Sequence, residues 1–309
     1  MPGRPHRADG LETPEAGRGP RRSPLRTLAR YARDAWRRAM NVTDRAQDPS
    51  GAPVPPGHLR IYYYRTRDLA GFVRARREAR AEALSHGLKP GDRILDIGSG
   101  IGNLALALVE LPHDGSYDGL EIHPEAVAWC RTAITTSHPR FRFHHADIFS
   151  SAYNPAGRLS ASGYRFPFVD SRFDFVYLAS VFTHMLPADV AHYLSEIARV
   201  LAPGGVCAAS FFLLNDDRRA EVESGRSFMT FPCSDESGRA RLHDRGRPEA
   251  AVAIEESFVL DAYERAGLVV QRVRRGDWWN GRADDQDVIT AICSTMGRAH
   301  SSTVRAAGS

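Results

Sequence analysis

Residues 94–103 read Ile-Leu-Asp-Ile-Gly-Ser-Gly-Ile-Gly-Asn, and this stretch decides the fold. The apolar residues before Gly98 predict a short buried strand, and the residues from Asn103 onwards predict the start of a helix. Between them the glycines predict a tight turn. Because glycine has no Cβ, such a turn lets a nucleoside-bearing cofactor approach the backbone closely. The spacing is G-x-G-x-G, whereas turns that hold the pyrophosphate of a dinucleotide favour G-x-G-x-x-G.

Acidic residues end the first three expected strands, at Asp96, Glu121 and Asp147. In a doubly wound sheet the ends of successive strands line one crevice. There Glu121 can accept hydrogen bonds from two ribose hydroxyls and Asp147 one from an adenine amino group, while Asp96 would lie near a cofactor's ammonium end. One such residue could simply cap a helix. Three in register with a glycine turn favour S-adenosylmethionine (SAM), which carries a sulfonium and an amino-acid end but no phosphate.

The expected cofactor site combines the glycine turn with residues at the strand ends. Ile122 and Ile148 would sandwich the adenine ring, and Ser180 follows the fourth expected strand. The predicted cofactor-binding residues are Asp96, Gly98, Ser99, Gly100, Gly102, Asn103, Glu121, Ile122, Asp147, Ile148 and Ser180.

Strands and helices alternate from Arg93 onwards, which predicts a mostly parallel sheet with helices on both faces. A helix from about Leu69 to Ser85, capped by Asp68, precedes this region. Strands are expected near 93–97, 117–121, 141–146, 173–179, 204–213, 268–274 and 286–293. Helices are expected near 102–111, 124–136, 188–201 and 255–266.

The chain divides into an arm, a domain and a tail. Residues 1–57 are rich in Pro, Gly and Arg and predict a disordered basic arm, in which apolar residues at helical spacing predict an amphipathic helix over 25–40. That helix could touch an anionic membrane surface or nucleic acid, although docking on the main domain is the simpler interpretation. Residues 58–295 form the expected cofactor-binding domain, with a polar insertion at 215–250, and residues 296–309 a disordered tail.

The bulk composition narrows the class of protein. No apolar run approaches the roughly 18 residues that span a bilayer, and the N-terminus has no apolar signal-peptide core, so we predict a cytoplasmic protein. The cysteines lie far apart with no C-x-x-C pair, so neither a zinc site nor a disulfide framework is expected. Cys207 and Cys293 lie in expected strands and are predicted to be small core residues.

These features together resemble the class I SAM-dependent methyltransferases. The resemblance rests on Asp96 to Gly102, Glu121, Asp147 and the turn Arg199 to Gly205, and it covers about residues 86–295. It implies a doubly wound, seven-stranded Rossmann-like sheet of order 3-2-1-4-5-7-6 with an antiparallel last strand. It also implies SAM as methyl donor and S-adenosylhomocysteine as product. The run Phe173 to Met185 further resembles a bacterial subgroup with an S-V-F-T-H element after the fourth strand.

His184 is the candidate catalytic residue, because it lies just past the fourth strand, beside the expected methyl group. An acceptor that keeps its proton, such as a hydroxyl, needs a base, and a histidine suits that role. The alternative is that His184 caps a helix or packs under the substrate loop. His144 and His145 alternate along the third strand, and nothing nearby completes a metal site.

The sequence favours a methyltransferase for a small-molecule acceptor, methylated on O, N or C. An RNA or DNA methyltransferase using the basic arm is the alternative, opposed by Leu178 to Val181 where an N-P-P-Y-type tetrapeptide would stand. The third alternative is a non-catalytic scaffold with this fold, or an NAD-dependent oxidoreductase, which the glycine spacing opposes. Aromatic loop residues such as Tyr153, Tyr164 and Trp278 either stack on a planar substrate or anchor their loops. The acids Asp284, Asp285 and Asp287 are expected to be solvated.

Overall fold

The computed structural model describes residues 36, 48, 51–64, 68–110, 114–281 and 285–294. The chain divides into two compact units, residues 1–45 and 46–309. Of the first unit only Trp36 is described, so the helix expected over 25–40 lies otherwise outside the described residues, as do most of the arm and the tail at 296–309. The second unit holds the sheet and is described below.

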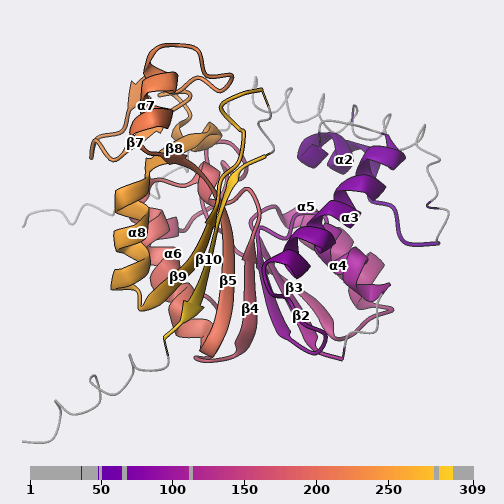
Figure 1. Cartoon of the computed structure of the whole chain (residues 1–309). Coiled ribbons are helices and arrows are strands. Elements are labelled where there is room, and N and C mark those ends of the chain that lie inside the picture. The colour runs from indigo at the N-terminus through magenta and orange to yellow at the C-terminus, as the bar shows by residue number, and fades with distance from the viewer. Residues whose placement is uncertain are drawn as a thin grey trace, which may run out of the picture. The chain divides into compact units, whose positions relative to one another are not determined.

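The main sheet has the strand order β3-β2-β1-β4-β5-β10-β9 (Figure 1). Strands β1 to β5 are parallel, and β10 runs antiparallel to both β5 and β9. This confirms the predicted order with its antiparallel last strand. The strands are β1 (Arg93–Ile97), β2 (Ser116–Glu121), β3 (Phe141–His145), β4 (Phe173–Leu178), β5 (Leu201–Leu214), β9 (Leu268–Arg274) and β10 (Asp287–Cys293).

Three further strands extend this sheet, so the described chain has ten strands where seven were expected. They are β6 (Cys233–Ser234), β7 (Ala240–Leu242) and β8 (Val252–Glu255). Strand β5 is long enough to pair twice: residues 206–211 pair with β10, and residues 212–214 pair in parallel with β8. The insertion after β5, which also forms helix α7 (Asp216–Glu223), therefore folds back onto the end of that strand.

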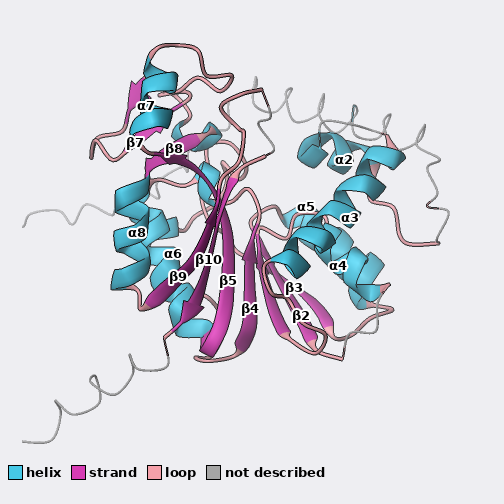
Figure 2. Ribbon diagram, in the orientation of Figure 1, coloured by secondary structure: helices cyan, strands magenta, loops and turns pink. Residues whose placement is uncertain are grey.

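Helices cover both faces of the sheet, as Figure 2 shows. Because successive side chains of a strand point to opposite faces, Ile94 packs into one apolar cluster and Leu95 into the other. The cluster of Ile94 includes residues of α3 and α4, and the cluster of Leu95 includes residues of α6 and α8. The helices are α3 (Leu69–Ser85), α4 (Asn103–Val109), α5 (Pro124–Cys130), α6 (Pro187–Val200) and α8 (Glu256–Arg265). No described helix is both long and apolar enough to cross a bilayer.

Helix α2 (Gly57–Tyr64) was not predicted. It begins directly after Pro55-Pro56, and the Pro56 carbonyl accepts hydrogen bonds from Leu59 N at 2.9 Å and Arg60 N at 3.1 Å, which satisfies amide groups that would otherwise lack a partner at the helix start. The predicted cap of the next helix is confirmed, since the Asp68 carboxylate accepts hydrogen bonds from Ala70 N at 3.1 Å and Gly71 N at 2.9 Å. Cys207 and Cys293 are buried as predicted.

Candidate active site

The glycine turn after β1 adopts the left-handed backbone that only glycine tolerates well. Gly98, Gly100 and Gly102 have φ values of 75°, 54° and 77°. A Cβ added at Gly100 would lie 3.1 Å from the ring of Tyr63, and one at Gly98 would lie 2.4 Å from Val181 Cγ2. The turn is thus closely packed by α2 and by the loop after β4.

Glu121 ends β2 and reaches the glycine turn, as the sequence predicted. Its side chain is buried, with 6% exposed. One carboxylate oxygen accepts a hydrogen bond from Gly100 N and the other from His123 N, both at 2.8 Å. Burial raises the pKa of this carboxyl, while the two backbone N–H groups hold the pKa down. A carboxylate has about four lone-pair positions, so one fixed in this way can also accept from ligand hydroxyls.

Asp96 lies beside Glu121, but its hydrogen-bond partner is a buried tyrosine and not the glycine turn. Its Oδ2 accepts a hydrogen bond from the Tyr117 hydroxyl at 2.5 Å. Burial raises the pKa of Asp96 to about 7, helped by the negative charge of Glu121 and opposed by the bond from Tyr117. The contact of Asp96 with a cofactor ammonium group stays a prediction.

Asp147 lies at the rim of the site and does not join the buried carboxyls. Its side chain is 26% exposed and pairs with Arg158 Nε at 2.5 Å, which holds the pKa of Asp147 below its usual value. The flanking apolar residues are more enclosed, because Ile148 is buried and Ile122 is half-buried. A bond from an adenine amino group to Asp147 would share this carboxylate with Arg158.

Two polar side chains of the turn carry buried atoms that have no hydrogen-bond partner among the described residues, Ser99 Oγ and Asn103 Oδ1. Buried polar atoms without a partner are rare in folded proteins and call for an explanation, such as a ligand or ordered water. Ser99 packs over Gly119, where an added Cβ would lie 2.7 Å from its hydroxyl. A hydroxyl and an amide oxygen of the turn are thus available to a polar ligand, and they fit the amino-acid end of SAM, which carries both an ammonium donor and a carboxylate acceptor.

Ser180 closes a hydrogen-bonded ring at the end of β4. It has a φ of 55°, which is uncommon for a residue other than glycine. Its N–H donates to Ser210 Oγ at 2.7 Å, Ser210 Oγ donates to Gln286 Oε1 at 2.6 Å, and Gln286 Nε2 donates to Ser180 Oγ at 2.8 Å. The ring holds the start of the loop that leads to His184. The sequence predicted Ser180 here but not Ser210 or Gln286.

A row of aromatic rings crosses the site, and it joins Tyr153 and His184, which the sequence singled out, to Tyr62 and Tyr63, which it did not. Tyr63, which packs on Gly100, lies 5.1 Å from Tyr62 between ring centroids. Tyr62 lies 6.1 Å from Tyr153, and Tyr153 lies 4.8 Å from His184. The signal for Tyr62 and Tyr63 in the sequence was the run Tyr62 to Tyr64 shortly after two prolines.

His184 is held between two partners. Its Nδ1 lies 3.0 Å from the carbonyl oxygen of Glu249, and its Nε2 lies 3.0 Å from the Tyr153 hydroxyl. Burial lowers the pKa of His184, and the backbone of Glu249 and Ala250 opposes this only in part. Burial therefore favours the neutral form of the imidazole.

Trp278 anchors its loop, because it is fully buried and its Nε1 donates to Asp287 Oδ2 at 2.7 Å. The expectation that Asp287 is solvated is wrong: the residue is 1% exposed and also accepts from Leu213 N and Gly276 N, both at 3.0 Å. Three converging donors stabilise its charge away from water. Asp285 pairs with Arg274 at 2.8 Å, and Asp284 lies outside the described residues.

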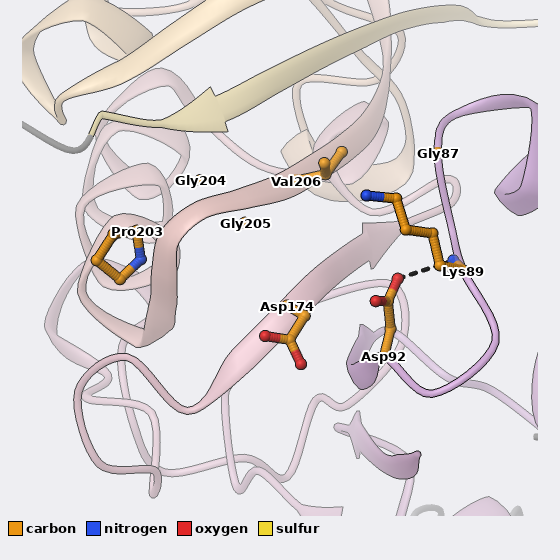
Figure 3. Close-up of a pocket in the computed structure, with 8 residues that line it drawn as sticks. All are labelled: Gly87, Lys89, Asp92, Asp174, Pro203, Gly204, Gly205 and Val206. Atoms are coloured by element: carbon orange, nitrogen blue, oxygen red, sulfur yellow. Dashed lines mark hydrogen bonds between the residues drawn. The ribbon is translucent and has the colours of Figure 1, made fainter. Parts of the chain in front are cut away.

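A second, polar hollow lies at the opposite end of the strands (Figure 3). It is lined by Gly87, Lys89, Asp92, Asp174, Pro203, Gly204, Gly205 and Val206. Asp174 stands near the start of β4 and is bound by Arg93, the first residue of β1, at 2.7 and 2.8 Å. The glycine turn follows the other end of β1, so this hollow is not part of the candidate active site.

Comparison with known proteins gives one family. Residues 94–205 match the sequence model of a family described as a methyltransferase domain. The demethylmenaquinone methyltransferase of Thermus thermophilus is 34% identical over 117 residues, which cover 38% of this chain and 46% of that protein. The 2-methyl-6-phytyl-1,4-hydroquinone methyltransferase of a Synechocystis species is 29% identical over 191 residues, which cover 62% of this chain and 51% of that protein. The chain thus spans about half the length of these two curated relatives.

Among solved structures, this chain is similar to the 1,6-didemethyltoxoflavin-N1-methyltransferase of Burkholderia thailandensis, crystallised with 1,6-didemethyltoxoflavin and S-adenosylhomocysteine. The two are 20% identical with a TM-score of 0.48, over 79% of this chain and 92% of that one.

Proposed function

We propose that this chain is a class I SAM-dependent methyltransferase that transfers the methyl group of SAM to a small organic acceptor. The observation that carries the proposal is the fixed, buried Glu121 carboxylate hydrogen-bonded to the backbone of the glycine turn. A dinucleotide would instead need backbone N–H groups turned toward a pyrophosphate, and Gly100 N is already bound to Glu121.

SAM supplies a methyl group activated by its sulfonium. The chain's part is to bind and orient it: Glu121 accepts from the ribose hydroxyls, and the glycine turn allows close approach of the backbone. Ile122 and Ile148 flank the adenine, and Asp147 at the rim accepts from its amino group. Asn103, Ser99 and Ser180 offer polar atoms at the remaining edge, and Asp96 lies on the ammonium side.

The acceptor is a small, largely apolar molecule that carries a hydroxyl. Tyr62 and Tyr153 give the site an aromatic wall, and exposed Phe149 and Leu159 follow β3 near it. The names of the two relatives agree with a largely apolar ring compound as acceptor, because one names a quinone and the other a hydroquinone. A cytoplasmic location, and the lack of a nucleic-acid partner, stay predictions from the sequence.

Calorimetric titration tests the cofactor and radiolabel transfer tests the reaction. The full chain should bind SAM and S-adenosylhomocysteine but not NAD. It should then transfer label from methyl-labelled SAM to a member of a panel of hydroquinones and phenols. A folded chain that binds neither SAM nor its product would overturn the proposal, and so would binding of NAD alone.

A further inference from the structure

We infer that the Tyr153 hydroxyl contacts the acceptor hydroxyl, and that His184, which is hydrogen-bonded to Tyr153, takes up the acceptor's proton. The inference rests on the proposed function, because it gives a role in that reaction to a residue so far treated as part of a loop. Three features of the described residues lead to it: the tautomer of His184, the position of Tyr153, and the contacts that hold both side chains.

The tautomer of His184 follows from its partners. A backbone carbonyl can only accept a hydrogen bond, so the Nδ1 atom at 3.0 Å from the Glu249 oxygen must carry the proton. In the neutral imidazole the lone pair then lies on Nε2. The Tyr153 hydroxyl at 3.0 Å must donate to that lone pair. The basic atom of His184 is therefore already engaged by a phenol.

The position of Tyr153 places it between His184 and the cofactor residues. Rings follow one another from Tyr63, which packs on Gly100, through Tyr62 to Tyr153 and then His184. Beyond His184 comes Glu249, at the end of the insertion. A proton that leaves an acceptor bound beside the cofactor, on the Tyr62 side of Tyr153, thus meets the Tyr153 oxygen before it meets His184.

Both side chains are held from several sides. Tyr153 N donates to Ser150 Oγ at 3.2 Å, and the Tyr62 hydroxyl donates to the Tyr153 carbonyl at 3.1 Å. Ser151 donates to the Glu249 carboxylate. Since the Glu249 carbonyl also accepts a hydrogen bond from His184 Nδ1, one residue of the insertion fixes both the loop and the histidine. Such support keeps a catalytic pair aligned without reorganisation.

The proton transfer balances. The acceptor oxygen forms a bond to the methyl carbon as the carbon–sulfur bond breaks, and the electron pair of that bond stays on sulfur, which leaves as a neutral thioether. The acceptor's hydroxyl proton passes to Tyr153 Oη while the proton of Tyr153 passes to His184 Nε2. The positive charge lost at sulfur then lies on the imidazolium, whose Nδ1–H is bound by the Glu249 carbonyl. The imidazolium later returns its proton to solvent.

Nitrogen NMR of the full chain labelled with ¹⁵N-histidine tests the pair without any ligand. His184 is assigned among the 12 histidines by the signal that disappears in His184→Gln. We expect a neutral ring protonated on Nδ1 at pH 7. Tyr153→Phe should raise the pKa of His184, because the neutral ring loses its hydrogen-bond donor. The control is Tyr164→Phe, which removes the hydroxyl of another tyrosine in the connection before β4. It should leave the His184 signals unchanged. A ring protonated on Nε2, or a titration unmoved by Tyr153→Phe, would overturn the inference.

Steady-state kinetics test the catalytic role of Tyr153. The substrate is the hydroquinone of the panel that the chain methylates fastest. General-base catalysis contributes about 10²- to 10⁴-fold, so Tyr153→Phe should lower kcat by about a hundredfold or more and leave the affinity for S-adenosylhomocysteine unchanged. The double variant with His184→Gln should be no slower than the slower single variant, since the two residues act as one unit. If His184→Gln lowers kcat and Tyr153→Phe does not, His184 contacts the acceptor itself and the inference is wrong. Failure to bind SAM would overturn the proposed function and leave the NMR result to decide the inference.

Discussion

Replacing Glu121 by glutamine perturbs the cofactor site at a single atom. The carboxylate accepts one hydrogen bond on each oxygen, from Gly100 N and from His123 N. Glutamine keeps the shape and the burial but replaces one oxygen by an NH₂ group, which cannot accept. Whichever way the amide turns, one backbone N–H loses its partner and faces another donor.

The size of the effect follows from the bonds involved. Hydrogen bonds to a charged group are worth about 1.5–3 kcal/mol, so losing the charged acceptor of a ribose hydroxyl should weaken binding by about 10- to 150-fold. The orphaned backbone N–H should cost about 1–3 kcal/mol of the free energy of unfolding. Part of that cost is offset, because neutral glutamine avoids burying the charge whose desolvation raises the pKa of Glu121.

Calorimetric titration with S-adenosylhomocysteine measures the loss of cofactor affinity, and urea denaturation measures the change in the free energy of unfolding. Glu264→Gln is the matched control: it makes the same change of charge at an exposed position of α8 and should alter neither. A dissociation constant for Glu121→Gln within twofold of the unmodified chain would refute the assignment of Glu121 to the cofactor ribose.

Gly100→Val should abolish binding of S-adenosylhomocysteine in a chain whose circular dichroism still shows it folded, since a Cβ there lies 3.1 Å from Tyr63 at a φ of 54°; retained binding would contradict the role of the turn. Asp96, with its pKa raised to about 7, keeps in the folded state a proton that the unfolded chain releases above about pH 4. The free energy of unfolding should therefore fall as pH rises from about 4 to 7, and Asp96→Asn should flatten that slope in urea titrations at several pH values. Asp287→Ala should cost about 3 kcal/mol or more in urea denaturation, because three buried donors lose their acceptor; a cost below about 1 kcal/mol would mean that water replaces the carboxylate.

The main sheet was predictable because its signals are local. Strands β1, β2 and β4 are segments of five or six residues bounded by turns, and the alternation with helices fixes parallel pairing. Strands β6 and β7 could not be found in the same way, because two and three residues are too short to show a period. They exist because β5 continues past the end of β10 and offers unpaired backbone to β8.

The cofactor half of the site was predictable for a geometric reason. Parallel strands end at one edge of the sheet, so Glu121 and Gly100 had to lie close together once both strands were recognised. Asp147 ends outside the buried group because Arg158, later in the same loop, pairs with it. No spacing rule in a single sequence predicts such a partner across an irregular loop.

The acceptor half was not predictable, because it is assembled from segments that are distant along the chain. His184 meets Tyr153 across 31 residues and Glu249 across 65 residues. Neither partner lies in a motif. Both pairings depend on how the connection before β4 and the insertion after β5 fold over the strand ends.

Glu249 links the insertion after β5 to the acceptor side of the site, so changes in the insertion can reach the acceptor pocket. The insertion contacts the acceptor side through His184 and Ser151, whereas Glu121 accepts hydrogen bonds from the glycine turn and from His123. Strand β8 fixes the end of the insertion by pairing with the last residues of β5, which lie beyond the part of β5 that pairs with β10. Substitutions in the insertion can therefore alter the acceptor pocket and the alignment of His184 while the hydrogen bonds at Glu121 stay intact. This separation is a physical reason why one cofactor motif can serve different acceptors.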